Sequence, residues 1–130
     1  CSASSQSYGY NDFWYIMRYN AADGTYTQIF TSPQYSKGIT NLKVVDFNND
    51  NNYSIVLSYD DGSIEIYDGK TRALLKKIKA VNERINSLVY ADADNDSKKD
   101  IVIACENNTY VLDANSFQQK FKIAQGSKHV

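Results

Sequence analysis

The chain has 130 residues and a formal net charge of −1, with 42% hydrophobic and 22% charged residues. This length is sufficient for one domain with a hydrophobic core, and this composition excludes wholesale disorder. With 14 basic and 15 acidic side chains, the chain lacks the excess of positive charge that is typical of proteins that bind nucleic acid or an anionic membrane. Eleven Tyr and a single Pro, with many β-branched residues, favour strands over helices.

Residues 1–10 are predicted to form a flexible tether. Cys1 precedes the small polar string Ser2–Ser7, and this start resembles a mature bacterial lipoprotein, in which the terminal Cys carries lipid. No apolar run is long enough to span a bilayer, so membrane attachment is expected only through a lipid on Cys1. This interpretation predicts an extracellular or cell-envelope location. The alternatives are a cut within a longer protein and a cytoplasmic location.

Residues 11–130 are predicted to form a single β-domain that begins with a partial repeat unit at 11–32. Two runs rich in strand-forming residues, Phe13–Tyr19 and Thr25–Phe30, flank the turn dipeptide Asp23-Gly24. They are expected to be the last two strands of an earlier unit.

Two further units follow, at 39–80 and 85–124, and they are related by an internal repeat. The segment ITNLKVVD at 39–46 aligns with INSLVYAD at 85–92. The same shift of 46 residues aligns three more pairs: Asp50 with Asp96, Ile55 with Ile101, and Val56 with Val102. After one deleted residue, Asp68 aligns with Asp113.

Each unit contains four short strand-like runs separated by turn residues. In the first unit they are Asn41–Phe47, Tyr53–Tyr59, Ser63–Tyr67 and Ala73–Lys79; in the second they are Ser87–Ala91, Asp100–Cys105, Thr109–Leu112 and Gln118–Ile123. Four antiparallel strands in about 45 residues are typical of a β-propeller blade. The predicted fold is therefore all-β, with about two and a half propeller-type blades. A fragment of a longer chain is the first interpretation, and the alternatives are a homo-oligomer and closure as a sandwich.

An acidic loop, Asp92–Asp100, separates the first two strands of the second unit. Carboxylates stand at its positions one, three, five and nine, which are Asp92, Asp94, Asp96 and Asp100. Calcium takes six to eight hard oxygen ligands, and alternate positions of a tight turn can direct several carboxylates at one centre. The first unit repeats this frame with weaker ligands, which are Asp46, Asn48, Asp50 and Ser54. Any calcium site there is expected to bind less tightly.

These loops and the apolar strands after them resemble FG-GAP and VCBS-type repeats, whose signature is D-x-D-x-D-G-x-x-D followed by an apolar strand. The resemblance covers roughly residues 39–123 and implies a propeller with calcium in its loops, serving adhesion or ligand binding at a cell surface. Two departures matter. The usual glycine at position six is Asn51 or Ser97, and Lys98 and Lys99 put positive charge beside the predicted ion.

The alternative interpretation of both loops needs no metal, because Asp and Asn side chains at turns accept hydrogen bonds from nearby backbone amides. Such loops then serve only as corners, as in WD40-like and quinoprotein-like propellers. Calcium is the first interpretation for the second loop, because four close carboxylates repel one another without a cation. For the loop at Asp46, the first interpretation is a hydrogen-bonded turn that holds no metal.

Catalysis finds little support in the sequence. The only histidine, His129, is the penultimate residue, and no phosphate loop, nucleophile elbow or Cys/His zinc spacing is present. The predicted function is a non-catalytic, calcium-stabilised module that presents a surface to a protein or glycan. The alternatives are part of a quinoprotein-like enzyme and a metal-free WD40-like scaffold.

Overall fold

The computed structural model describes residues 2–4 and 12–124, which form three antiparallel sheets. The first sheet has the order β1-β2-β3, from β1 (Ser2–Ser4), β2 (Phe13–Asn20) and β3 (Thr25–Thr31). The second has the order β4-β5-β6-β7, from β4 (Ile39–Val45), β5 (Ser54–Tyr59), β6 (Ser63–Asp68) and β7 (Leu74–Lys79). The third has the order β8-β9-β10-β11, from β8 (Ile85–Ala91), β9 (Asp100–Cys105), β10 (Asn108–Asp113) and β11 (Gln119–Ala124). The prediction of an all-β fold built from four-stranded antiparallel blades is confirmed.

The segment predicted as a tether, residues 1–10, is described only at Ser2–Ser4. Those three residues form β1, which pairs antiparallel with β2 and places Ala3 opposite Trp14. The edge of β2 offers backbone groups that another strand can pair, so this part of the segment is a strand instead. Cys1, the rest of the tether and the C-terminal residues with His129 lie outside the described residues. Within the described ranges, no helix has the length and apolar character needed to cross a bilayer.

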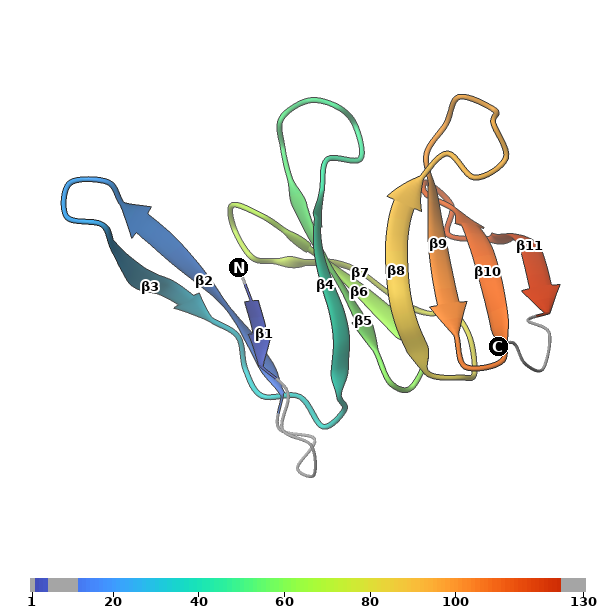
Figure 1. The fold of residues 1–130 in the computed structure, drawn as a ribbon, viewed down its shortest axis with the longest axis horizontal. Coiled ribbons are helices and arrows are strands. Elements are labelled where there is room, and N and C mark those ends of the chain that lie inside the picture. The colour runs from blue at the N-terminus through green and yellow to red at the C-terminus, as the bar shows by residue number, and fades with distance from the viewer. Residues whose placement is uncertain (1, 5–11, 125–130) are drawn as a thin grey trace.

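The three sheets stand side by side along the chain, and strands β1, β4 and β8 lie next to one another (Figure 1). The Asn41 side-chain amide on β4 donates a 3.2 Å hydrogen bond to the backbone carbonyl of Asn86 on β8. Each four-stranded sheet therefore has one strand beside a neighbouring sheet, as in adjacent propeller blades. The second sheet has one face toward the first sheet and the other face toward the third.

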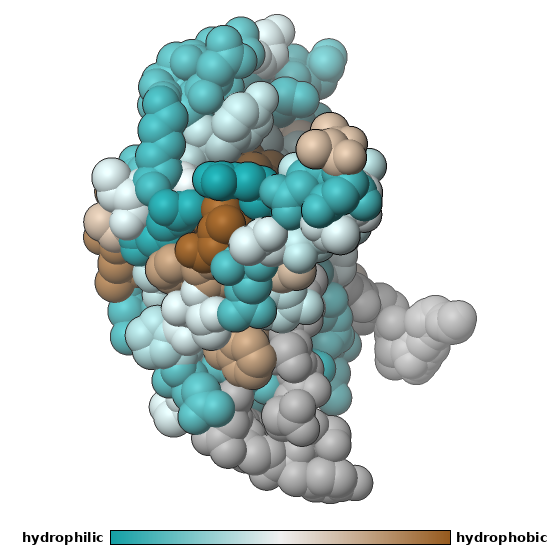
Figure 2. All heavy atoms as spheres, turned by 90° about the vertical axis from the view of Figure 1, so that its left-hand side faces the viewer, coloured by the Kyte–Doolittle hydropathy of each residue, from teal (hydrophilic) through white to brown (hydrophobic). Residues whose placement is uncertain are grey.

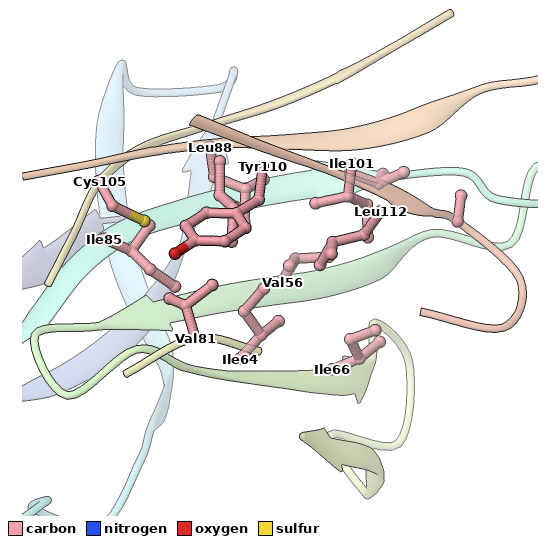
Figure 3. Close-up of a cluster of buried hydrophobic side chains, with 13 residues drawn as sticks. Val56, Ile64, Ile66, Val81, Ile85, Leu88, Ile101, Cys105, Tyr110 and Leu112 are labelled. Carbon is pink, nitrogen blue, oxygen red and sulfur yellow. The ribbon is translucent and has the colours of Figure 1, made fainter. Parts of the chain in front are cut away.

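The interface between the second and third sheets is a core of buried aliphatic side chains. Ile64 and Ile66 on β6 pack toward Ile101 on β9 and Leu88 on β8 (Figure 3). Alternate residues of a strand point to opposite faces, so the period of two in these strands supplies one apolar face to each sheet. Val81, in the connection from β7 to β8, is 7% exposed and closes one end of this core.

The interface between the first and second sheets is built at equivalent positions. Its buried members Ile39, Ile55 and Leu57 stand 46 residues before Ile85, Ile101 and Ile103 of the other core. The connecting segments match as well. Tyr35 N–H donates to Asp12 O at 2.9 Å, and Val81 N–H donates to Gly62 O at 3.1 Å.

Trp14 on β2 is fully buried in this first interface, in the place that Ile64 of β6 has in the second. Strands β2 and β3 thus take the positions of the third and fourth strands of a blade, beside β4–β7. A smaller core that contains Trp14 and Tyr59 and a larger, mostly aliphatic core are therefore built on the same plan.

Candidate metal site in the second acidic loop

The two acidic loops occupy equivalent places in the second and third sheets. The first loop joins β4 to β5 and the second joins β8 to β9, and both project from the same edge of the molecule (Figure 1). The internal repeat in the sequence therefore places two homologous loops on one surface.

Both loops share the same internal hydrogen bonds at their first position. The carboxylate of Asp46 accepts hydrogen bonds from the backbone N–H groups of Asp50 at 3.2 Å and Asn51 at 2.8 Å. The carboxylate of Asp92 accepts them from Asp96 at 3.2 Å and Ser97 at 2.9 Å. The first aspartate of each loop thus fixes the turn, because its carboxylate accepts hydrogen bonds from the backbone N–H groups four and five residues further along the chain.

The loops also share two residues with left-handed backbone conformation. In the first loop, Asn49 and Asn51 have φ of 56° and 66°; in the second, Asn95 and Ser97 have φ of 63° and 71°. Asn tolerates this region and Gly adopts it freely, whereas Ser is strained there. Position six, where the resembled repeats carry Gly, has the conformation that explains that preference.

Three carboxylates of the second loop come together, from Asp92, Asp94 and Asp100. One oxygen atom from each lies within 4.8 Å of the other two, a spacing that could hold a metal ion. Asp100 is the first residue of β9 and is fully buried, and one of its oxygen atoms accepts a 3.1 Å hydrogen bond from Ala93 N–H. A buried carboxylate needs a cation or strong donors beside it.

Lys120 on β11 supplies a positive charge to this cluster. Its Nζ lies 2.6 Å from Asp94, 3.0 Å from Asp100 and 3.4 Å from Asp96. These hydrogen bonds, the one to Asp94 above all, raise the pKa of Lys120 above its usual value. The ammonium therefore stays charged at neutral pH and balances part of the charge of the loop.

The cluster fits a divalent cation in donor type, because every side chain in it is a carboxylate. Both oxygen atoms of Asp92 accept backbone hydrogen bonds, yet each keeps a second lone pair toward an ion. Asp96 lies outside the group of three, and one of its oxygen atoms accepts a 2.8 Å hydrogen bond from Lys98 N–H. Any ion held by the three carboxylates must share them with the Lys120 ammonium or displace it.

The predicted positive charge beside the loop comes from a different lysine. Lys98 and Lys99 are exposed, and the ammonium that contacts the carboxylates belongs to Lys120. No local pattern in the sequence points to Lys120. The internal repeat is what could indicate Lys120. The equivalent position 45 residues earlier is Leu75, so the lysine occurs only in the unit whose loop has more acids.

The first loop has no comparable carboxylate cluster. Asn48 and Ser54 stand where the second loop has Asp94 and Asp100, so Asp46 and Asp50 are its only acids. Asp50 accepts a 2.9 Å hydrogen bond from Asn52 N–H. Hydrogen bonding to the side chain and backbone of Asn52 lowers the pKa of the exposed Asp50 carboxyl. These contacts give the first loop the geometry of a hydrogen-bonded corner.

Sequence reasoning also missed a polar chain that crosses the first interface. Trp14 Nε1 donates to the Tyr35 hydroxyl at 3.0 Å, which lies 3.0 Å from the Tyr67 hydroxyl. The Tyr67 hydroxyl donates to Glu65 at 2.9 Å, and the Lys37 ammonium lies 3.7 Å from the same carboxylate. Burial, followed by hydrogen bonds to Tyr35 and Glu65, raises the pKa of Tyr67. These residues come from three separate segments, at Trp14, at residues 35–37 and at residues 65–67, so only the packing of the sheets brings the segments together.

Comparison with known proteins supports the fold alone. No protein-family model matches the chain, and no curated protein matches it in sequence. The chain is similar to one in a solved structure titled "Crystal Structure of Mitotic Checkpoint Complex", with a TM-score of 0.59 and 14% sequence identity. The match covers 98% of this chain and 35% of that one, so this chain spans about a third of its length.

The structural neighbour is propeller-like, in agreement with the predicted blades. The finer resemblance to FG-GAP and VCBS-type repeats stays a prediction, since it rests on the acidic loops of the sequence. The conclusion is that the chain consists of β-propeller-type blades.

Proposed function

We propose that the chain is a non-catalytic β-propeller scaffold that binds a protein partner through the edge carrying the two acidic loops. The observation that carries the proposal is that both loops have one hydrogen-bonded frame and project from the same edge of adjoining sheets. Loops that a packed scaffold holds in place are the usual position of recognition residues. The propeller-like neighbour comes from a structure titled as a complex, which agrees with a protein partner.

The proposed binding edge is polar with one exposed ring. Asn51 and Asn52 in the first loop and Ser97 in the second are exposed, and Tyr53 is 51% exposed. Amide and hydroxyl groups offer adaptable hydrogen bonds, and an exposed Tyr supplies contact area at low entropic cost. The same chemistry suits a glycan, so the test below has an arm for each class.

We assign calcium to the second loop as the ion that stiffens this edge. Asp92, Asp94 and Asp100 would provide its carboxylate oxygen atoms, and the first loop, with Asn48 and Ser54, would bind it less tightly or not at all. Because Lys120 already holds Asp94 and Asp100, calcium would have to overcome that ion pair. Its affinity is therefore expected to be modest and to rise when Lys120 is neutralised.

A metal-free WD40-like scaffold is the second candidate, and the position of Lys120 favours it. The ammonium already balances the buried charge of Asp100 without any ion. The two candidates share the binding role and differ in their response to calcium. A location on a bacterial envelope through a lipid on Cys1 is a separate proposal, which the mass of the protein isolated from its source would test.

Two experiments test the binding edge. The purified chain is crosslinked to proteins in an extract of its source, and its binding to an array of glycans is measured. The loop variant Tyr53→Asp with Asn52→Lys is compared with the wild type and with Thr27→Lys, an exposed change on β3. A protein captured by the wild type and by Thr27→Lys, but lost with the loop variant, supports the proposal. Equal capture by all three chains contradicts the assigned edge, and binding only to glycans replaces the protein partner by a glycan.

A further inference from the structure

The last strand of each sheet lies at the outer edge of that sheet. These strands are β3, β7 and β11, and within the part of the chain that the structure describes no strand pairs with their outer sides. Such an edge presents unpaired backbone N–H and C=O groups, which a strand of another chain can pair with. Proteins commonly block these edges with lysine side chains or with a β-bulge. The three edges differ in how far they carry these two protective features.

Lysine side chains protect two of the three edges. β7 carries Lys76, Lys77 and Lys79, and β11 carries Lys120 and Lys122. β3 has the sequence TYTQIFT, which contains no charged residue and no proline. Apart from its glutamine, every residue type in it favours strands. Among the described outer strands, β3 is therefore the one whose edge carries no charge.

A bulge interrupts all three outer strands at equivalent positions, but it protects β3 less. The pairing with the preceding strand skips Ile29 in β3, Leu75 in β7 and Lys120 in β11. Only one residue of β7 and one of β11 precede the skipped residue, whereas residues 25–28 of β3 precede it. A bulge disrupts strand pairing only where it lies. We call residues 25–28, which form a regular and uncharged edge, the open edge.

The open edge lies at the end of the molecule farthest from the third sheet, next to the turn between β2 and β3 (Figure 1). All four of its residues are exposed. The second sheet has a neighbouring sheet on both faces, and yet five of the six residues of its outer strand β7 are exposed. The outer edge of a sheet thus stays accessible even where both faces of the sheet are covered.

Two tyrosine rings stand beside the open edge. Tyr19 and Tyr26 are directly paired across β2 and β3, they are 56% and 66% exposed, and their ring centroids are 5.2 Å apart. Seen from the β2–β3 side, the surface is mostly hydrophilic, with a single strongly apolar patch near its middle (Figure 2). This end therefore offers backbone hydrogen bonds and two rings to a partner, and not a broad hydrophobic face.

We propose that the open edge is a self-association site, at which residues 25–28 of two copies of this chain pair antiparallel and join their first sheets. Two identical antiparallel strands are related by a two-fold axis, so one edge serves both copies. A pairing centred on these four residues puts Tyr26 opposite the partner's Thr27, and it brings no like charges together. A second copy fits this edge because β3 lacks the lysines that hinder such pairing at β7 and β11.

The predicted association is weak. A pairing of four residues buries much less surface than a standard protein interface, so we expect a dissociation constant on the order of 100 µM. The site is separate from the proposed binding edge at the two acidic loops, so either proposal can fail without the other.

The test is a dilution series of the 130-residue chain from about 2 mM to about 20 µM, followed by two-dimensional NMR of its assigned backbone amides. The diagnostic variant Thr27→Lys places two ammonium groups beside the two-fold axis. Its matched control is Thr27→Val, because both substitutions remove the hydrogen bond that Asn20 donates to the Thr27 hydroxyl and only one adds a charge. A second control, Thr71→Lys, adds the same charge to the exposed turn between β6 and β7. The dispersion of the spectra verifies folding, and Gln28→Lys replaces Thr27→Lys if that variant does not fold.

The proposal predicts concentration-dependent shifts that are largest at the amides of residues 25–28 in the wild type, Thr27→Val and Thr71→Lys. The folded lysine variant of the open edge should have a dissociation constant raised about fivefold or more. A wild type whose spectrum does not change up to 2 mM, which is about twenty times the expected constant, overturns the proposal. Shifts confined to other strands overturn it as well, and so does equal self-association of the wild type and the lysine variant.

Discussion

The ammonium of Lys120 lies 2.6 Å from the carboxylate of Asp94, and this contact ties β11, the last described strand, to the loop between β8 and β9 of the same sheet. The same Nζ lies 3.0 Å from Asp100, a carboxylate that is fully buried. In the first unit, the corresponding positions are Leu75, Asn48 and Ser54. The two acids and the lysine are present together in one unit and absent together from the other, as expected of groups that compensate one another.

Replacing Lys120 by Met should destabilise the chain when divalent cations are removed by a chelator. The change leaves Asp94 and Asp100 without their cation, and an unpaired buried carboxylate is costly. Thermal melts in chelator should show a melting temperature lower by roughly 5 °C or more. The matched control Leu75→Met, at the equivalent position of the first unit, should melt within about 1 °C of the wild type. Equal melting of the two variants would exclude Lys120 as the counter-ion.

Replacing Ser97 by Gly should stabilise the chain. Ser97 has φ of 71°, and the left-handed region is strained for a residue with a Cβ atom. The free energy of unfolding should rise by about 0.5–1 kcal/mol, measured by urea denaturation. Asn51→Gly, at the same position of the first loop, should gain less, because Asn tolerates this region better. A loss of stability in Ser97→Gly would contradict the loop conformation.

Replacing Gly62 by Ala should be much more harmful than replacing Gly24 by Ala. Both residues have positive φ, 86° and 71°. A Cβ atom at Gly62 would lie 2.1 Å from the carbonyl oxygen of Val81, whereas one at Gly24 would meet nothing within 4 Å. Urea denaturation should show a loss of about 1 kcal/mol for Gly24→Ala and of at least about 3 kcal/mol for Gly62→Ala. Equal losses would contradict the close approach between the β5–β6 turn at Gly62 and the segment at Val81 that leads to the third sheet.

The thiol of Cys105 should react slowly in the folded protein. Cys105 is 3% exposed, and burial, followed by the charge of Glu83, raises its pKa to about 11. Because only the thiolate is nucleophilic, alkylation by iodoacetamide at pH 8 should be far slower than in urea and should accelerate as the pH rises. The measurement uses a Cys1→Ser variant, in which Cys105 is the only cysteine. Alkylation at the same rate in native buffer and in urea would contradict this burial.

The strands could be predicted from the sequence because each carries its own local pattern. The predicted strand Asp100–Cys105 has the same bounds as β9, and the predicted strand Ser63–Tyr67 is only one residue shorter than β6. The predicted first strand of each unit begins at Asn41 or Ser87, two residues after the start of β4 or β8. In both strands the pairing shifts just after the first residue, at Ile39 or Ile85, and this irregularity hides the period of two.

The candidate site could be predicted only in part, because some of its residues lie in one loop and another comes from a distant strand. Asp92, Asp94 and Asp100 belong to one loop, so their spacing alone indicated a cluster. Lys120 reaches that cluster from β11, two strands away from β9 in the sheet, and no periodicity predicts such a contact. The Lys37–Glu65 pair and the buried Trp14 depend in the same way on how one sheet packs on the next.

Calcium titration by calorimetry tests most directly whether the second loop is a metal site set against Lys120. The wild type is compared with Lys120→Met and with the double variant Asp94→Asn, Lys120→Met. We predict saturable heat for the wild type, tighter binding for Lys120→Met, and loss of binding in the double variant, because calcium and the ammonium compete for Asp94 and Asp100. No heat in any variant at millimolar calcium would contradict the calcium assignment and favour a metal-free scaffold in which Lys120 alone neutralises the loop.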